Sequence, residues 1–270
     1  MPIDEESAKR LIPDQRKWIV KIVGACEQPF RRIRYRSEDT FGLMALCYVS
    51  KQLDHARSLG RLLEDPPSRD ASVIARSMLE GASYLQWGVL EKVDRAEQWL
   101  EFTAVEEWRR LRDADLIGLE VTPEERLSIE EAIKNHGDRF LTKDAKKKKN
   151  QRKSLPGNPY IPSWIGMSFG TVVEKTKSED LRIIYSLMSH SVHWGPGSVR
   201  SYLIPKNGDT LEYRAISFPD AASAGGWGII CLLQTAGIAA EHFELDDLAA
   251  LIRRFYADYD ELHSSVVTNG

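Results

Sequence analysis

The sequence has few cysteines and lacks several common nucleotide- and metal-binding motifs. Three cysteines occur in 270 residues, at Cys26, Cys47 and Cys231, and no CxxC pair is present. An odd number of isolated cysteines argues against a disulfide framework and a cysteine zinc site, and it favours a reducing compartment. The patterns GxGxxG, GxxxxGK(S/T) and HExxH are also missing. We therefore expect a cytoplasmic protein without a cofactor, and the common nucleotide-dependent and zinc-hydrolase chemistries lack support.

A strong net charge and long apolar runs are also missing. The net charge is −3, which gives no global attraction to nucleic acid or to an anionic membrane. The N-terminus has no basic start followed by an apolar run, so we expect no signal peptide. Residues 225–240 are the most membrane-like stretch, but they contain Gln234 and fall short of the roughly 20 apolar residues that a spanning helix needs. We interpret this stretch as a central buried helix and expect no membrane partner. Its glycines and alanines would also suit close packing in a homodimer.

Apolar residues recur at helical spacing through most of the chain. The stretch from Thr122 to Glu125 is a capping box with proline at the first helical position, which predicts a helix from Pro123. Asn207-Gly208 between two apolar-rich runs predicts a β-hairpin near residues 201–216, which must pack on helices. We predict a mainly α-helical protein, a multi-helix bundle in a single domain over residues 1–270 with this one small hairpin. The predicted helices cover residues 14–26, 39–63, 70–91, 94–116, 123–136, 169–176, 179–194, 219–243 and 246–264.

Residues 142–162 change to a basic segment that also contains proline and glycine. This composition predicts a flexible basic loop over about 142–162. The lysine run within it could contact the phosphates of RNA. Charge runs in loops are usually solvated, however, and no aromatic residues alternate with the lysines to stack on bases. A nucleic-acid interface is one hypothesis and a solvated surface is the alternative for Lys146, Lys147, Lys148 and Lys149.

The predicted helix over 179–194 carries an unusual mixture of polar residues opposite its apolar side. Solvent faces are usually dominated by lysine, glutamate and glutamine, whereas hydroxyls, imidazoles and one arginine indicate a half-buried polar surface. A histidine there could act as a general base or bind a phosphate, since its unperturbed pKa lies near about 6.5. Alternatively, these side chains only satisfy buried backbone groups. At about 100° per residue, one side of the helix collects Arg182, Tyr185, Ser186, Ser189, His190 and His193.

The predicted helix over 70–91 has a similar mixed face. Arg76, Glu80, Tyr84 and Trp87 share one side of this helix. Arg76 and Glu80 are four residues apart, so one interpretation is a local ion pair worth about 0.5 kcal/mol. The other is that Glu80 holds Arg76 in place while the guanidinium reaches across to the polar face of the later helix. In that case the two mixed faces line a shared polar cleft.

The same two helices also contain residues that ligate metals in other helical bundles. His190 and His193 are three residues apart, and Glu80 would join them if the helices touch. The bundle di-metal signature repeats its Glu-x-x-His pair, and this repeat is missing here. We therefore predict no metal site.

Together, Arg76-x-x-x-Glu80-x-x-x-Tyr84, Trp164 and Tyr185-x-x-x-Ser189-x-x-x-His193 resemble the pattern of a bacterial family, domain of unknown function 5677. The resemblance covers roughly residues 40–200. It implies a helical fold and the same two helices, and no established activity. A wider similarity is to the HEPN superfamily of helical bundles, which includes toxin-like ribonucleases. The signature of that superfamily is an arginine followed closely by a histidine, but here seven residues separate Arg182 from His190, a longer spacing.

Three functional hypotheses follow. The first is a ligand- or RNA-binding helical module of a bacterial defence or stress setting, whose partner is RNA or a small anionic ligand. The second is a HEPN-like, metal-independent ribonuclease. In that case His193 or His190 would be the general base, and Arg76 or Arg182 would stabilise the charge that develops on the phosphate. The third is a structural or oligomerising module built on the glycine- and alanine-rich helix.

Overall fold

The computed structural model describes residues 3–34, 36–155, 157–192, 202–206, 210–214 and 216–268. The chain divides into two compact units, one formed by Met1–Leu90 with Phe169–Gly270 and the other by Glu91–Ser168. Each unit is described by itself below. The expectation of a single domain over 1–270 stays a prediction, whereas the mainly α-helical fold is confirmed.

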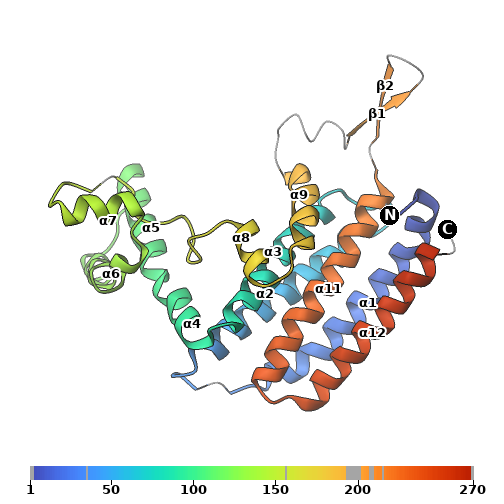
Figure 1. The fold of residues 1–270 in the computed structure, drawn as a ribbon, viewed down its shortest axis with the longest axis horizontal. Coiled ribbons are helices and arrows are strands. Elements are labelled where there is room, and N and C mark those ends of the chain that lie inside the picture. Colours follow the sequence, from blue (N-terminus) through green and yellow to red (C-terminus); the bar gives the residue numbers. More distant parts are fainter. Residues whose placement is uncertain are drawn as a thin grey trace. The chain divides into compact units, whose positions relative to one another are not determined.

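The first unit is built around one central helix, α11 (Phe218–His242), shown in orange in Figure 1. It packs against α1 (Glu5–Arg31), α2 (Thr40–Leu62), α3 (Ala71–Val89) and α12 (Asp246–Thr268). Glycines allow these close approaches. A Cβ atom at Gly225 would lie 2.4 Å from Gln15 Oε1, and one at Gly228 would lie 2.2 Å from Leu59 Cδ2. These two small residues therefore serve packing within the chain, and a homodimer stays a prediction.

In the part of the chain that the structure describes, α11 alone is long and apolar enough to cross a membrane. The mean hydropathy of its most apolar window is 1.3, and 61% of that window is buried inside the protein. The core helix of a globular bundle has these same properties. Its four helical neighbours agree with its interpretation as a central buried helix.

The first helix begins at Glu5, so the predicted start at residue 14, directly after Pro13, is wrong. Asp4 caps α1 by accepting a hydrogen bond from the Ser7 amide at 2.9 Å. Pro13 lies inside the helix, where its missing N–H removes one backbone hydrogen bond. Leu11 and Ile12 just before it are buried, so the apolar face of the helix continues through the proline.

Two shorter helices and the hairpin complete the first unit. α8 (Phe169–Lys175) and α9 (Asp180–Val192) both pack on α3. Strands β1 (Leu203–Lys206) and β2 (Thr210–Tyr213) form the predicted antiparallel hairpin. Arg69 links this hairpin to the helices, because its guanidinium donates to the Arg214 carbonyl at 2.8 Å and lies 4.5 Å from the Tyr202 ring centroid.

The second unit contains α4 (Lys92–Glu101), α5 (Thr103–Ile117), α6 (Pro123–His136), the 3-10 helix η1 (Gly137–Phe140) and α7 (Lys143–Asn150). The Phe102 and Phe140 rings pack edge to face at 5.2 Å in its core. The expectation of a flexible loop over 142–162 is wrong for its first part, which is α7. Thr142 caps this helix by accepting from the Ala145 amide at 3.2 Å, and Ala145 is fully buried. Arg109 hydrogen-bonds the Ile161 carbonyl at 2.7 Å near the other end of the segment.

Candidate functional site

The two mixed-face helices meet in the structure, where Arg76, Glu80 and Tyr185 form one hydrogen-bonded cluster. Arg76 Nη2 donates to Glu80 Oε1 at 3.3 Å and to Tyr185 Oη at 2.5 Å. Tyr185 Oη in turn donates to Glu80 Oε1 at 2.7 Å. Each of the three groups therefore contacts the other two. We call these three residues the α3–α9 cluster.

Aromatic rings surround this cluster. Phe169 of α8 stacks on Tyr185 with ring centroids 4.1 Å apart and an interplanar angle of 18°. The Arg76 guanidinium carbon lies 4.6 Å from the Tyr185 ring centroid, a cation–π distance. Tyr84 also lies near Phe169, with ring centroids 6.4 Å apart. The cluster thus connects three helices, α3, α8 and α9.

Burial strengthens the preference of both tyrosines for the protonated form, which already dominates at neutral pH because the ordinary tyrosine pKa is about 10. It raises the pKa of Tyr84 to about 12, and the nearby Glu80 carboxylate acts in the same direction. Burial also raises the pKa of Tyr185, while its hydrogen bond from Arg76 opposes this shift and the bond to Glu80 reinforces it. Both phenols are therefore protonated at neutral pH. Tyr185 can donate a hydrogen bond there, but it offers no phenolate base or nucleophile.

The charges of the α3–α9 cluster are paired, although the Nε group of Arg76 is buried without a hydrogen-bond partner. The Arg76 side chain is 17% exposed and that of Glu80 is 31% exposed, and their opposite charges pair at 3.3 Å. An arginine that binds a phosphate needs free N–H groups in its planar fork and a positive charge that is not already offset. The Nη2 group of Arg76 is committed to Glu80 and Tyr185. This arrangement fits a joint that holds α8 and α9 on α3.

The other described residues of the predicted polar face make no hydrogen bond to a side chain of the cluster. Ser189 Oγ donates to the Tyr185 carbonyl at 2.6 Å, a local bond within α9. Arg182 is exposed, and a Cβ atom at Gly170 of α8 would lie 3.5 Å from its Nε atom. His190 is exposed, and His193 lies outside the described residues. The ribonuclease hypothesis, which requires one of these histidines as a base, stays a prediction.

The lysines predicted to contact RNA lie on α7, and three of them have neighbours within their own unit. Lys146 donates to the Arg139 carbonyl at 3.5 Å, and Lys148 pairs with Asp144 at 3.4 Å. Lys149 pairs with Asp138. These are exposed contacts of the kind that contributes little to stability. An RNA interface at Lys146 to Lys149 stays a prediction.

The ranges that the structure describes contain no group of three or more His, Cys, Asp or Glu residues that could hold a metal ion. Two histidines that the sequence did not single out have partners elsewhere in the chain, one a neutral serine and the other an aspartate. His55 Nε2 lies 3.2 Å from Ser77 Oγ, and burial lowers its pKa, with Lys51 acting in the same direction. His242 Nε2 lies 2.9 Å from Asp39, the residue that caps α2. Both contacts join helix to helix.

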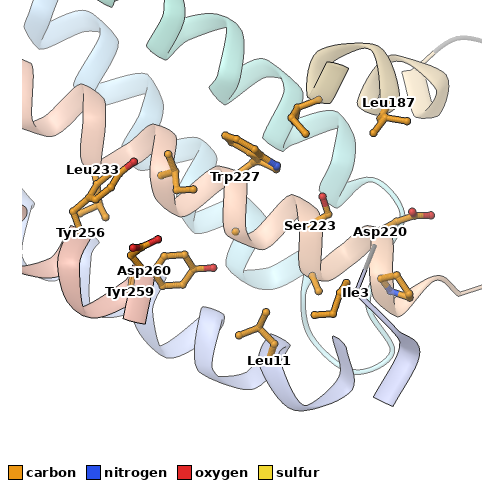
Figure 2. Close-up of a pocket in the computed structure, with 15 residues that line it drawn as sticks. Ile3, Leu11, Leu187, Asp220, Ser223, Trp227, Leu233, Tyr256, Tyr259 and Asp260 are labelled. Atoms are coloured by element: carbon orange, nitrogen blue, oxygen red, sulfur yellow. The ribbon is translucent and has the colours of Figure 1, made fainter. Parts of the chain in front are cut away.

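The structure also contains a cavity of about 660 Å³ in the first unit (Figure 2). Residues of α1, α9, α11 and α12 line it, and most of the lining is apolar. α11 contributes Ser223, Trp227 and Ile230, spaced three and four residues apart on one side of the helix. α12 contributes Tyr256 and Asp260, which are four residues apart.

Sequence reasoning missed this cavity because its walls come from helices that are distant in the chain. The spacing of Ser223, Trp227 and Ile230 within α11 was the available signal. These three are exposed or half-buried, whereas most of the surrounding residues of α11 are buried. A stripe of this kind on an otherwise buried helix marks a face that no neighbouring helix covers fully.

Comparison with known proteins places the chain in a family but gives no activity. No curated protein and no solved structure matches it. The model of the family of unknown function DUF5677 matches residues 43–210, which include both helices of the α3–α9 cluster as well as Trp164. Since this match covers more than half of the sequence, the chain belongs to the family of unknown function DUF5677.

Proposed function

We propose that this protein is a small-molecule-binding helical protein whose ligand occupies the cavity beside α11. The cavity itself carries this proposal. Its volume of about 660 Å³ lies within the usual range of ligand sites, roughly 300–1,000 Å³. Its lining is mostly apolar with a few polar groups, which is the usual composition of a site that takes an organic molecule.

The α3–α9 cluster supports this proposal indirectly. Its two opposite charges pair with each other and its hydroxyl bonds to both, so the cluster has no net charge to attract an ionic ligand. The cavity differs because it provides both volume and apolar surface. Ile184 and Leu187 of α9 line the cavity, while Tyr185 of the same helix belongs to the cluster. The cluster therefore supports one wall of the proposed site.

The proposal can be tested with a neutral, apolar, environment-sensitive dye such as Nile red. We expect saturable binding to the purified full-length protein, read as an increase in dye fluorescence. Ser223→Trp places a large ring at the cavity lining and should reduce the affinity at least about tenfold, because the added volume competes with the dye.

Ser50→Trp is the matched control, because Ser50 is likewise an exposed helical serine of the first unit, on α2, and is not part of the lining. It should leave dye binding unchanged. Thermal unfolding of both variants verifies that each remains folded. Equal dye binding by the two folded variants, or no saturable binding by the wild type, would contradict the proposal.

A further inference from the structure

The charged side chains that line the cavity are both acidic. Asp220 and Asp260 both line it, and the described lining includes no lysine, arginine or histidine. Figure 2 shows Asp260 beside Tyr256 and Tyr259 at one end of the cavity and Asp220 at the other end, near Ile3. A carboxylate accepts hydrogen bonds and attracts cations. The lining therefore favours a ligand of opposite charge to the small anion that the sequence suggested.

The two carboxylates differ in their surroundings. Asp220 lies in the first turn of α11, where its amide donates to Ser217 Oγ at 3.4 Å. Its carboxylate pairs with Arg69 at 3.4 Å, and that arginine is only 10% exposed. Asp260 forms no ion pair with any basic side chain that the structure describes. Asp260 is therefore the carboxylate available to a ligand.

Tyr256 and Tyr259 of α12 lie beside Asp260, and Trp227 lines the cavity from α11 (Figure 2). Asp260 and Tyr256 are both exposed, whereas Tyr259 is buried. The faces of tryptophan and tyrosine rings attract organic cations, and this attraction increases where water is partly excluded. A carboxylate next to such rings, at the end of an apolar cavity, has the chemistry that recognises an ammonium group attached to an apolar body.

We infer that the ligand of this cavity is a small organic cation, an amine whose ammonium group pairs with Asp260 and whose apolar body lies along α11 between Trp227 and Leu187. This inference rests on the proposed function. The apolar body would contribute most of the affinity by leaving water, and the ammonium group would provide selectivity.

The test compares three probes with the same body: 4-phenylbutylamine, 4-phenylbutan-1-ol and 4-phenylbutyrate. Isothermal titration calorimetry with the full-length protein at pH 7 should give the tightest binding for the amine and the weakest for the carboxylate. We expect the amine to bind about fivefold or more tighter than the alcohol, the size of a favourable partly exposed ion pair. This preference should shrink as the salt concentration rises.

Asp260→Asn should remove the preference for the amine and leave the affinity for the alcohol unchanged. Asp258→Asn is the matched control, because Asp258 is exposed on the same helix but does not line the cavity. It should retain the preference.

The inference is overturned if the alcohol binds as tightly as the amine, or if the two variants behave alike. If Nile red and all three probes fail to bind, the proposed function itself is wrong and the inference fails with it. Dye binding without a preference for the amine would overturn the inference alone.

Discussion

The α3–α9 cluster and the α11 cavity lie on different sides of one helix, α9, and they use polar groups in opposite ways. In the cluster, Arg76, Glu80 and Tyr185 each bond to the other two. In the cavity, Asp260 lacks an ion pair with any basic side chain of the described residues and borders about 660 Å³ of space. Both regions therefore contain an unpaired polar group, the buried Nε group of Arg76 and the carboxylate of Asp260, and of these two only the carboxylate lines the cavity.

Tyr185→Ala should have the largest effect on stability, because it removes a stacked ring and every hydrogen bond between α9 and the cluster residues of α3. We expect the free energy of unfolding to fall by about 2–3 kcal/mol, below the value for a fully buried aromatic residue because Tyr185 is half-buried. Urea unfolding followed by circular dichroism measures the loss. Tyr213→Ala, on an exposed hairpin tyrosine, is the control and should cost less than about 0.5 kcal/mol. Equal losses in the two variants would mean that the cluster does not hold α9.

The coupling between the charges of the cluster can be isolated by a double-mutant cycle with Arg76→Met and Glu80→Gln. We expect a coupling energy of about 1 kcal/mol, since the two side chains are 17% and 31% exposed and solvent screens part of their attraction. Unfolding free energies of the wild type, both single variants and the double variant give this value. Strict additivity would show that the pair is incidental and that the aromatic stack alone fixes α9.

His55 of α2, which contacts Ser77 of α3, allows a test with a smaller and pH-dependent effect on stability. Burial lowers the pKa of His55 in the folded protein, so the unfolded chain binds the proton more tightly. The stability that the folded protein keeps by holding His55 neutral is fully present above the unfolded pKa of about 6.5. It is lost as the pH falls below that value, because protonation then favours the unfolded chain. The melting temperature of His55→Gln should therefore fall less steeply than that of the wild type between about pH 7 and 5. His190→Gln, at an exposed position, should retain the wild-type slope. An unchanged slope in His55→Gln would contradict the assigned shift.

Asp260→Asn should have the smallest effect on stability. Within the described residues its carboxylate has no ion pair to lose, so we expect a change in unfolding free energy of less than about 0.5 kcal/mol. Urea unfolding of this variant compares the stability contributed by an unpaired carboxylate with that contributed by the Arg76–Glu80 pair. A loss as large as that of the cluster variants would mean that Asp260 has a structural role, and the cavity would lose its free carboxylate.

Much of the fold follows from local patterns. Asn207-Gly208 predicted the hairpin, and helical periodicity found both α3 and α9 together with their polar faces. The local rule that proline marks a helix boundary failed at Pro13, which lies inside α1. The buried side chains of Leu11 and Ile12 keep the helix continuous through this residue. Periodicity also identifies which face of a helix is polar without identifying its partner. It could not predict that Glu80 and Tyr185 bind the Nη2 group of Arg76 while the buried Nε group has no hydrogen-bond partner.

α9 contributes Tyr185 to the cluster and Ile184 and Leu187 to the cavity. Because these residues share one rigid helix, a shift of α9 moves both contacts together. A molecule that binds the cavity more tightly when α9 is docked on α3 stabilises the docked position, and docking strengthens the binding by the same coupling free energy. If the proposed ligand binds in this way, a substitution of Tyr185 that populates the undocked position would lower the affinity, although the Tyr185 hydroxyl is bonded to residues outside the cavity lining.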